Sequence, residues 1–286
     1  MDIKGDPTQS CVIIMNVFGG ARSRGGKGPR GPRGFPGKDS SINDFCTWLP
    51  NTILKQHEEV CYILSRKNPE DDLIRGRNKT IEEWKSRNLK KGNLVAVHPS
   101  SELVETGDGG YALSFQKNLY QFGNPIIECI RGYGYICITF KVDGEEEQAL
   151  ITNYKAKDPL KNFHEISVTT SEINIRGYMQ NKPSQHTIQH DCRNWTTLFL
   201  DYTIHESAHS IEFTYILDND PSMQGSFTFQ SPIASLSGGN VGGRKDGTKV
   251  FSGAIHGLEF YHTASPKPLP QSLKELLINR QQVKHL

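Results

Sequence analysis

Short apolar runs separated by turn residues dominate the chain over 93–264. Segments such as "YGYICITFKVD", "EQALITNYK", "WTTLFLDYTIH" and "HSIEFTYILDN" are rich in β-branched and aromatic residues and are bounded by Gly, Asn, Asp or Pro. Apolar residues alternate in places, so that Ile136, Ile138 and Phe140 share one face and Cys137 lies on the other. About nine to twelve such segments without intervening helices predict a two-sheet antiparallel sandwich.

Apolar residues recur at a helical spacing on either side of this zone. In "TILKQHEEVCYILSRK" they form one stripe, and "KTIEEWKS" begins with a Thr cap followed by Glu three residues later. These features predict a helical stalk or hairpin over 46–92. A Pro-rich exit and one C-terminal helix are predicted over 265–286, where Leu273, Leu276 and Leu277 form an apolar stripe.

Glycine occupies every third position in "RGGKGPRGPRGFPGKD", at Gly25, Gly28, Gly31, Gly34 and Gly37. Since only glycine fits at the crowded axis of a collagen triple helix, this spacing predicts a collagen-like, otherwise disordered segment within 1–45. So short a segment needs neighbouring residues to hold three chains together, because ordering each residue costs about 1–2 kcal/mol. A plain linker and a basic arm that binds nucleic acid are the alternatives.

Charge and leader signals say little about partners. The 33 basic and 31 acidic side chains leave a net charge of +2, so the chain as a whole favours no strongly charged partner. No apolar run approaches the roughly 20 residues of a membrane helix. The run "CVIIMNVF" lacks a positive flank and makes a poor signal peptide. Sequons at Asn78 and Asn194 favour secretion and glycosylation.

The six cysteines leave several pairings open. Cys129 and Cys137 flank "IRGYGYI" and could close a hairpin disulfide, or Cys46 could pair with Cys61. Buried free thiols are the alternative.

Four segments resemble the landmark strands of laminin-G-like and concanavalin-A-like lectin and glucanase domains. They are "GGYALSFQKNLYQFG", "GYICITFKVDGEEEQALIT", "NWTTLFLDYTI" and "VFSGAIHGLEFYH". The resemblance implies a mainly β, jelly-roll sandwich over 93–264. In the closing segment we expect Gly253 to permit a close backbone approach before Ile255, Leu258 and Phe260 fill the core.

The resemblance does not extend to catalysis. The glucanase members carry an E-x-D-x-x-E strand, and retaining glycosidases hold two carboxyl groups about 5–5.5 Å apart. This sequence contains no such spacing, and its "DGEEEQ" segment reads as a solvated turn. We therefore expect a protein that is not an enzyme.

Rim loops bind ligands and calcium in several lectin-like folds, so the resemblance implies a site in "DNDPSMQG" and "LSGGNVGGRKDG". The residues are Asp218, Asn219, Asp220, Asn240, Arg244 and Asp246. Asp218 and Asp220 are the candidate metal ligands for calcium, the one ion considered, and no cofactor is required. Asp-Asn-Asp-Pro is equally ordinary turn chemistry.

Two histidine pairs, His186 with His190 and His205 with His209, have a spacing that suits zinc on a helix. We expect a loop and a strand–turn–strand at these positions, so no metal or catalytic role is predicted for them.

Together these features predict an extracellular recognition or adhesion protein whose lectin-like sandwich binds a glycan or a protein surface. The collagen-like stem would assemble it as a homotrimer, and we expect neither a nucleic-acid partner nor a membrane span. Two alternatives stay open. One is a structural, capsid-like sandwich with a nucleic-acid-binding basic arm, and the other is a degenerate glycosidase.

Overall fold

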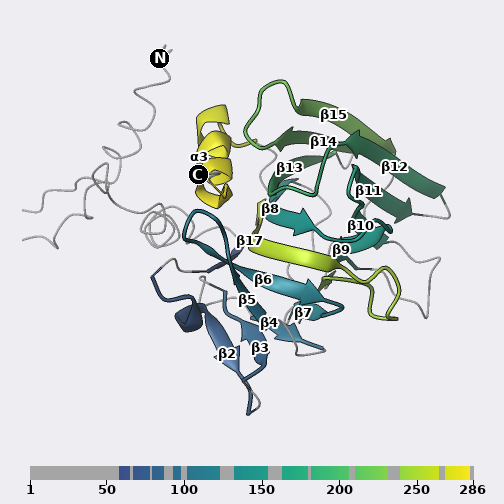
Figure 1. Cartoon of the computed structure of the whole chain (residues 1–286). Coiled ribbons are helices and arrows are strands. Elements are labelled where there is room, and N and C mark those ends of the chain that lie inside the picture. The colour runs from purple at the N-terminus through teal and green to yellow at the C-terminus, as the bar shows by residue number, and fades with distance from the viewer. Residues whose placement is uncertain are drawn as a thin grey trace, which may run out of the picture. The chain divides into compact units, whose positions relative to one another are not determined.

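The computed structural model describes residues 58–64, 67–77, 79–86, 93–97, 102–122, 132–153, 163–179, 182–205, 210–230, 239–263 and 268–283. These residues form two antiparallel β-sheets and one α-helix (Figure 1). The predicted mainly β, two-sheet sandwich with a C-terminal helix is confirmed. The predicted collagen-like glycines lie outside the described residues.

Sheet A has eight strands, and its long members β8 and β17 lie side by side near the middle. In spatial order the strands are β15 (Gln224–Gln230), β14 (Ser210–Leu217), β13 (Thr196–His205), β8 (Gly132–Val142), β17 (Ser252–Thr263), β6 (Tyr111–Gln116) and β5 (Glu102–Glu105), and β1 (Glu58–Ile63) also pairs with β17.

Sheet B has nine strands and covers the inner face of sheet A. In spatial order they are β12 (Lys182–Gln189), β11 (Glu172–Met179), β10 (Phe163–Val168), β9 (Gln148–Thr152), β16 (Asn240–Val241), β7 (Tyr120–Phe122), β4 (Leu94–Ala96), β3 (Ile81–Trp84) and β2 (Leu73–Arg75).

The main core fills the space between the two sheets, because each strand sends alternate side chains inward. Ile138 and Phe140 of β8 and Leu198 of β13 are fully buried there, and they belong to one continuous apolar cluster with residues of sheet B. Cys137 lies on the opposite face of β8 and is also fully buried, since the outer face of sheet A carries a second apolar cluster.

The closing strand β17 confirms the role predicted for Gly253. This residue has a φ of +152°, and a methyl group there would overlap the backbone carbonyl of Lys141 on the neighbouring strand. The β17–β8 register then shifts between Ile255 and Gly257, which inserts one extra residue. The bulge brings Ile255 and Leu258 to the same face despite their three-residue spacing, and both are fully buried in the core.

The helical prediction for 46–92 is wrong for the residues that the structure describes. They form β1, β2 and β3, together with one short 3-10 helix, η2 (Pro69–Asp72). The register of β2 and β3 shifts so that Glu82 is an extra residue. This bulge places Ile81 and Trp84 on one buried face at a three-residue spacing, which imitates a helical stripe.

The C-terminal helix α3 (Gln271–Gln281) packs on the outer face of sheet A, close to β8 and β13 (Figure 1). Leu277 and Ile278 contact a row of aromatic rings there, in which Tyr135 stacks between Phe199 and Tyr261. Leu276, predicted to belong to the apolar stripe, is instead 46% exposed. Among the described residues, no helix has the length and apolar character needed to span a membrane.

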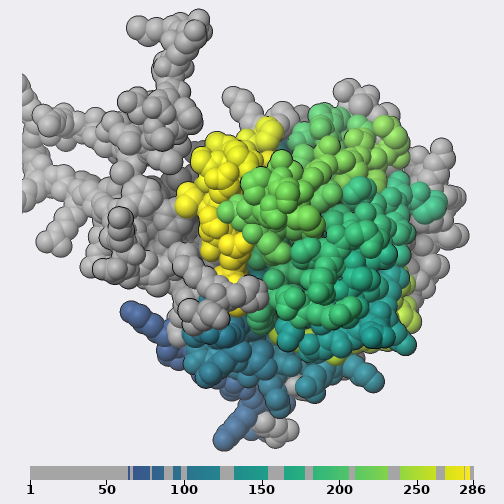
Figure 2. All heavy atoms as spheres, turned by 45° about the horizontal axis from the view of Figure 1, so that its top comes forward, coloured from purple at the N-terminus to yellow at the C-terminus, as the bar shows by residue number. Residues whose placement is uncertain are grey.

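Polar contacts also fix α3 to the sandwich. Lys274 forms an ion pair with the buried Asp201, which also accepts a hydrogen bond from Tyr133 (2.9 Å). Gln281 donates to the fully buried Glu259 (3.2 Å). In the space-filling view the helix, in yellow, lies directly against the green surface of the sandwich (Figure 2).

Candidate functional site

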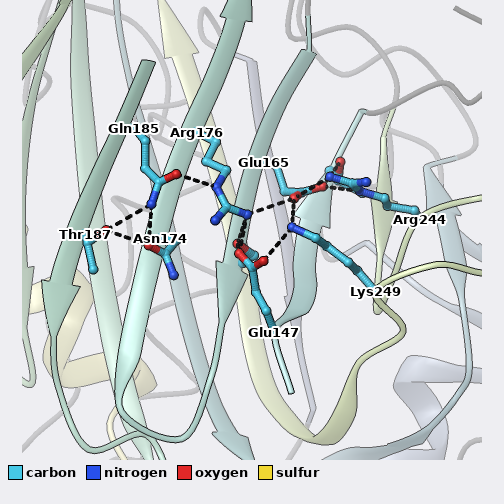
Figure 3. Close-up of polar contacts among 10 residues, drawn as sticks. Glu147, Glu165, Asn174, Arg176, Gln185, Thr187, Arg244 and Lys249 are labelled. Carbon is cyan, nitrogen blue, oxygen red and sulfur yellow. Dashed lines mark hydrogen bonds and ion pairs between the residues drawn. The ribbon is translucent and has the colours of Figure 1, made fainter. Parts of the chain in front are cut away.

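A row of polar side chains crosses the outer face of sheet B on three adjacent strands. In β10, Glu165 and Ser167 alternate with the inward Ile166 and Val168, and the same alternation continues along β11 and β12. The outward residues are Ser167 and five that Figure 3 labels: Glu165, Asn174, Arg176, Gln185 and Thr187. Three of the six, Glu165, Ser167 and Asn174, are buried although they lie on the outer face.

Glu165 lies at the centre of this surface and is fully buried. Arg244, from the loop that follows β16, donates to both carboxylate oxygens, with Nε to Oε2 at 2.7 Å and Nη2 to Oε1 at 2.9 Å. Thr152 of β9 donates to Oε2 (3.1 Å) and Lys249 to Oε1 (3.2 Å). A buried carboxylate held by two cations is a strong anchor between sheet B and the 242–251 loop.

Glu147, at the end of the β8–β9 connection, extends the cluster. Its carboxylate contacts Arg176, accepts a hydrogen bond from Ser167 (2.6 Å) and pairs with Lys249 (2.7 Å). Burial alone would raise the pKa of Glu147. The hydrogen bonds from Lys249 and Ser167 and the positive charges of Lys249 and Arg176 outweigh burial and lower that pKa. Glu147 therefore stays ionised.

Side-chain amides continue the row toward the edge strand β12. Arg176 Nε donates to Gln185 Oε1 (2.9 Å), and Gln185 Nε2 donates to Asn174 Oδ1 (3.0 Å). Thr187 also donates to Asn174 Oδ1 (2.6 Å). Each group orients the next, so the row is ordered before any ligand arrives (Figure 3).

A groove of about 910 Å³ adjoins the cluster at the rim of the sandwich. It is bordered by the β8–β9 connection, the end of β6 and the 247–252 segment, and Glu147 and Lys249 line it as well as belonging to the ion-pair cluster. Glu145 and Glu146 are exposed on its wall. The groove has the volume of a site for a small ligand, about 300–1,000 Å³.

The predicted residues of the second rim loop divide between structural roles and this site. Arg244 belongs to the ion-pair cluster. Asn240 is buried on β16, between β7 and β9. Asp246 closes a turn by accepting hydrogen bonds from the backbone and hydroxyl of Thr248 (3.0 and 2.6 Å). Burial works against these bonds, but the pKa of Asp246 is still lowered.

The predicted residues of the first rim loop form the β14–β15 turn, where Asp218 and Asn219 both have positive φ. Asp218 accepts from the backbone N–H of Thr197 (2.6 Å) and lies 3.2 Å from His190 Nε2. Asn219 donates to Asn279 of α3 (3.1 Å).

Asp220 accepts from the backbone and hydroxyl of Ser222, both at 2.8 Å, and these bonds lower its pKa. The turn chemistry considered as the alternative accounts for these contacts. Among the described residues, no group of three or more His, Cys, Asp or Glu side chains has an arrangement that would hold a metal.

The histidine pairs also gain a place in the fold. His186 lies in β12 and not in the predicted loop, and its ring stacks on Phe227 of β15 (4.1 Å between centroids). Burial lowers its pKa. His205 ends β13, as expected, and lies 3.4 Å from Glu212. His186 therefore contributes to packing between the sheets, and His205 forms a surface pair with Glu212.

The remaining predictions concern modification and redox state. Asn194 is exposed before β13, whereas Asn78 lies outside the described residues. Cys137 and Cys192 are buried thiols that form no disulfide, which agrees with the buried-thiol alternative at these two positions. The predicted disulfide between Cys129 and Cys137 is therefore not formed.

Sequence reasoning missed Glu147, Glu165, Arg176 and Lys249. The available signal was the polar alternation within otherwise apolar strands, such as "HEISV" and "EINIRG".

Comparisons with known proteins find partial structural similarities only. No protein-family model matches the sequence, and no curated protein matches it. A similar solved structure is domain 4 of an extracellular GH43 arabinanase from Geobacillus stearothermophilus, in complex with arabinotriose. It has a TM-score of 0.49 and 12% identity, over 80% of this chain and 100% of that one.

Two further solved structures are similar. A CBM40 module of a Ruminococcus gnavus sialidase, bound to α2,3-sialyllactose, has a TM-score of 0.40 and 11% identity over 63% of this chain and 100% of that one. Domains LG4–5 of the mouse laminin α1 chain have a TM-score of 0.35 and 10% identity, over 61% of this chain and 49% of that one. The assignment of a two-sheet sandwich rests on the strand pairing described above.

Proposed function

We propose that this protein is a non-enzymatic recognition protein whose sandwich binds a glycan on the polar outer face of sheet B and in the adjoining groove. The observation that carries the proposal is the row of hydrogen bonds and ion pairs from Thr187 through Arg176 to Glu165. A polyhydroxylated ligand needs many donors and acceptors at fixed positions, and this row supplies them.

The order within the row favours binding. Holding the side chains in place before association reduces the conformational entropy lost when a ligand binds. Gln185 and Thr187 are exposed at one end of the row, and Glu145 and Glu146 are exposed at the groove. A ligand would thus meet solvent-accessible groups at both ends of an otherwise rigid, partly buried surface.

The state of the carboxylates supports binding without catalysis. A glycosidase needs one carboxylic acid whose pKa is raised, so that it can protonate the leaving group. Here Lys249 and Arg176 hold Glu147 ionised, and Arg244 and Lys249 bind Glu165. Both groups are paired with cations, which suits a structural or ligand-orienting role.

We propose that this sandwich acts outside the cell as an adhesion module, carried on a collagen-like, trimeric stem. A protein surface is the alternative ligand. The stem proposal rests on the glycine period from Gly25 to Gly37. Gly28→Ala with Gly31→Ala in the full chain should lower the molar mass measured by light scattering. An unchanged mass would contradict the stem.

A glycan array probed with the full chain tests the binding proposal, with neutral and acidic glycans and with and without calcium. Gln185→Ala with Thr187→Ala should weaken binding of any hit by about tenfold, the loss of two hydrogen bonds. Gln271→Ala with Ser272→Ala, at exposed polar positions on helix α3, is the matched control and should bind normally. No hit under any condition, or equal binding by both variants, would refute the site.

A further inference from the structure

The outer edges of the two sheets differ in how they are protected against pairing with another strand. A free edge is usually short, charged or interrupted by proline. Among the described residues, β2 has three residues and ends at Arg75, and β5 has four residues with exposed Glu102 and Glu105. The edge strand β12 begins with Lys182 and Pro183. Each of these edges carries a protective feature.

The edge strand β15, with the sequence QGSFTFQ, carries none of these features. It has seven residues, no charge and no proline, and it lies at the end of sheet A (Figure 1). Its outward residues, Gln224, Ser226, Thr228 and Gln230, are all exposed. A regular, neutral strand of this length is a template for a further strand.

The inner face of β15 is fixed by aromatic packing. Phe227 stacks on His186 (4.1 Å between centroids) and on Phe213 (4.8 Å), and Phe229 is buried. Phe227 is nevertheless only half-buried, because no described strand lies beyond it. Tyr215 of β14 lies over Gly225, so the strand is held in register along its whole length.

We propose that two copies of this chain associate through β15, antiparallel to each other, about a two-fold axis at Phe227. The sequence is nearly palindromic about this residue. In that register Gln224 faces Gln230 of the second copy, and Ser226 faces Thr228 of the second copy. Gly225 faces Phe229 of the second copy, and the two Phe227 residues face each other.

This register matches side chains on both faces of the sheet. Polar residues meet polar residues on the outer face, and apolar residues meet on the inner face, since a two-fold axis perpendicular to the sheet preserves the faces. An aromatic ring opposite a glycine is a favourable cross-strand pair, and the half-buried Phe227 gains cover. The occupant of the edge is therefore a second copy, in a closed interface with isologous contacts.

Two variants of the full chain test both the contact and its register. Ser226→Lys with Thr228→Lys places two like-charged pairs across the axis, whereas Ser226→Glu with Thr228→Lys places two opposite-charged pairs there. The variants differ only at residue 226. Each of the two cross-strand pairs changes from repulsive to attractive between the variants, so their association constants should differ by about fourfold or more.

Sedimentation equilibrium supplies the readout, and thermal melting checks that both variants fold. We expect the particle mass of the wild type and of the Glu/Lys variant to be twice that of the Lys/Lys variant. This ratio holds whatever oligomeric state the rest of the chain adopts. Equal masses for the wild type and the Lys/Lys variant would overturn the contact. Equal weakening by both variants would overturn the register.

Hydrogen exchange on the wild type needs no variant. Half of the backbone groups of β15 face the edge on which no described strand pairs, because β14 is its one described neighbour. These amides should exchange faster as the protein is diluted, while those of β14 stay protected. Exchange in β15 that is independent of protein concentration would also overturn the proposal.

Discussion

The ion-pair cluster on sheet B predicts a large loss of stability for Glu165→Gln. The substitution preserves the shape of a fully buried side chain but removes its negative charge and places an NH₂ group against cations. Arg244 would lose a two-pronged contact at 2.7 and 2.9 Å, and Lys249 a contact at 3.2 Å. Arg244 and Lys249 would then be partly buried positive charges without the negative charge of Glu165 to balance them.

The expected magnitude follows from burial. Removing one partner of a buried pair costs about 3–5 kcal/mol. The side chains of Arg244 and Lys249 are 16% and 23% exposed, and Lys249 keeps its pair with Glu147, so water and the second carboxylate recover part of this loss. We therefore expect a decrease of about 2–4 kcal/mol in the free energy of unfolding.

Equilibrium unfolding in urea measures this decrease, with Glu212→Gln as the matched control. Glu212 is 55% exposed and lies 3.4 Å from His205, so its substitution should change stability by less than about 1 kcal/mol. High salt should weaken the small effect at Glu212 and leave the large effect at Glu165. If Glu165→Gln changed stability no more than the control, the anchoring role of the cluster would be refuted.

Three further predictions concern single residues. Burial lowers the pKa of His164 to about 4, and its Nε2 atom has no hydrogen-bond partner. Between pH 6.5 and 4 the folded chain therefore binds fewer protons than the unfolded chain, and the wild type should lose up to about 3 kcal/mol of stability over this range. Urea unfolding against pH should show this loss in the wild type but not in His164→Leu. A pH slope unchanged by the substitution would count against this. Gly253→Ala should lower the free energy of unfolding by about 2–4 kcal/mol, because the positive φ and the Lys141 carbonyl leave no room for a methyl group. Gly107 lies in open space, so Gly107→Ala should be nearly neutral in the same urea assay. Burial, together with the charge of Asp191, raises the pKa of the Cys192 thiol to about 12. Iodoacetamide at pH 8 should therefore label Cys192 only in denaturant, as detected by peptide mass spectrometry. Labelling of the native chain would contradict the burial of Cys192.

Much of the fold was predictable because alternation and turn residues are local signals. The long strands of sheet A and the C-terminal helix followed from the pattern along the chain, and the closing role of Gly253 followed from the resemblance to lectin-like domains. The error over 46–92 has a specific physical cause. A β-bulge adds one residue, so Ile81 and Trp84 share a face at a spacing that also describes a helix. Tertiary pairing decides between the two, and a local pattern does not contain it.

The candidate site was far less predictable. Arg244 was selected for its loop, but its partner Glu165 is 79 residues away in sequence and reaches it only through the folded arrangement of the sheet. Glu147 was read as part of a solvated turn, since a run of three glutamates is usually exposed. Asp218 was predicted to bind a ligand or calcium, and in the folded turn its carboxylate accepts from Thr197 and its backbone carbonyl from Gln282.

The position of β17 has a consequence for the order in which the chain is made. This strand, close to the C-terminus, pairs with β8 and β6 on its two sides and also with β1. Until residue 263 leaves the ribosome, β6 and β8 lack their shared neighbour and sheet A exists as two separate halves. The sandwich therefore closes after most of the chain has been translated. A premature stop before β17 would leave sheet A in two unconnected parts, β5–β6 and β15–β14–β13–β8.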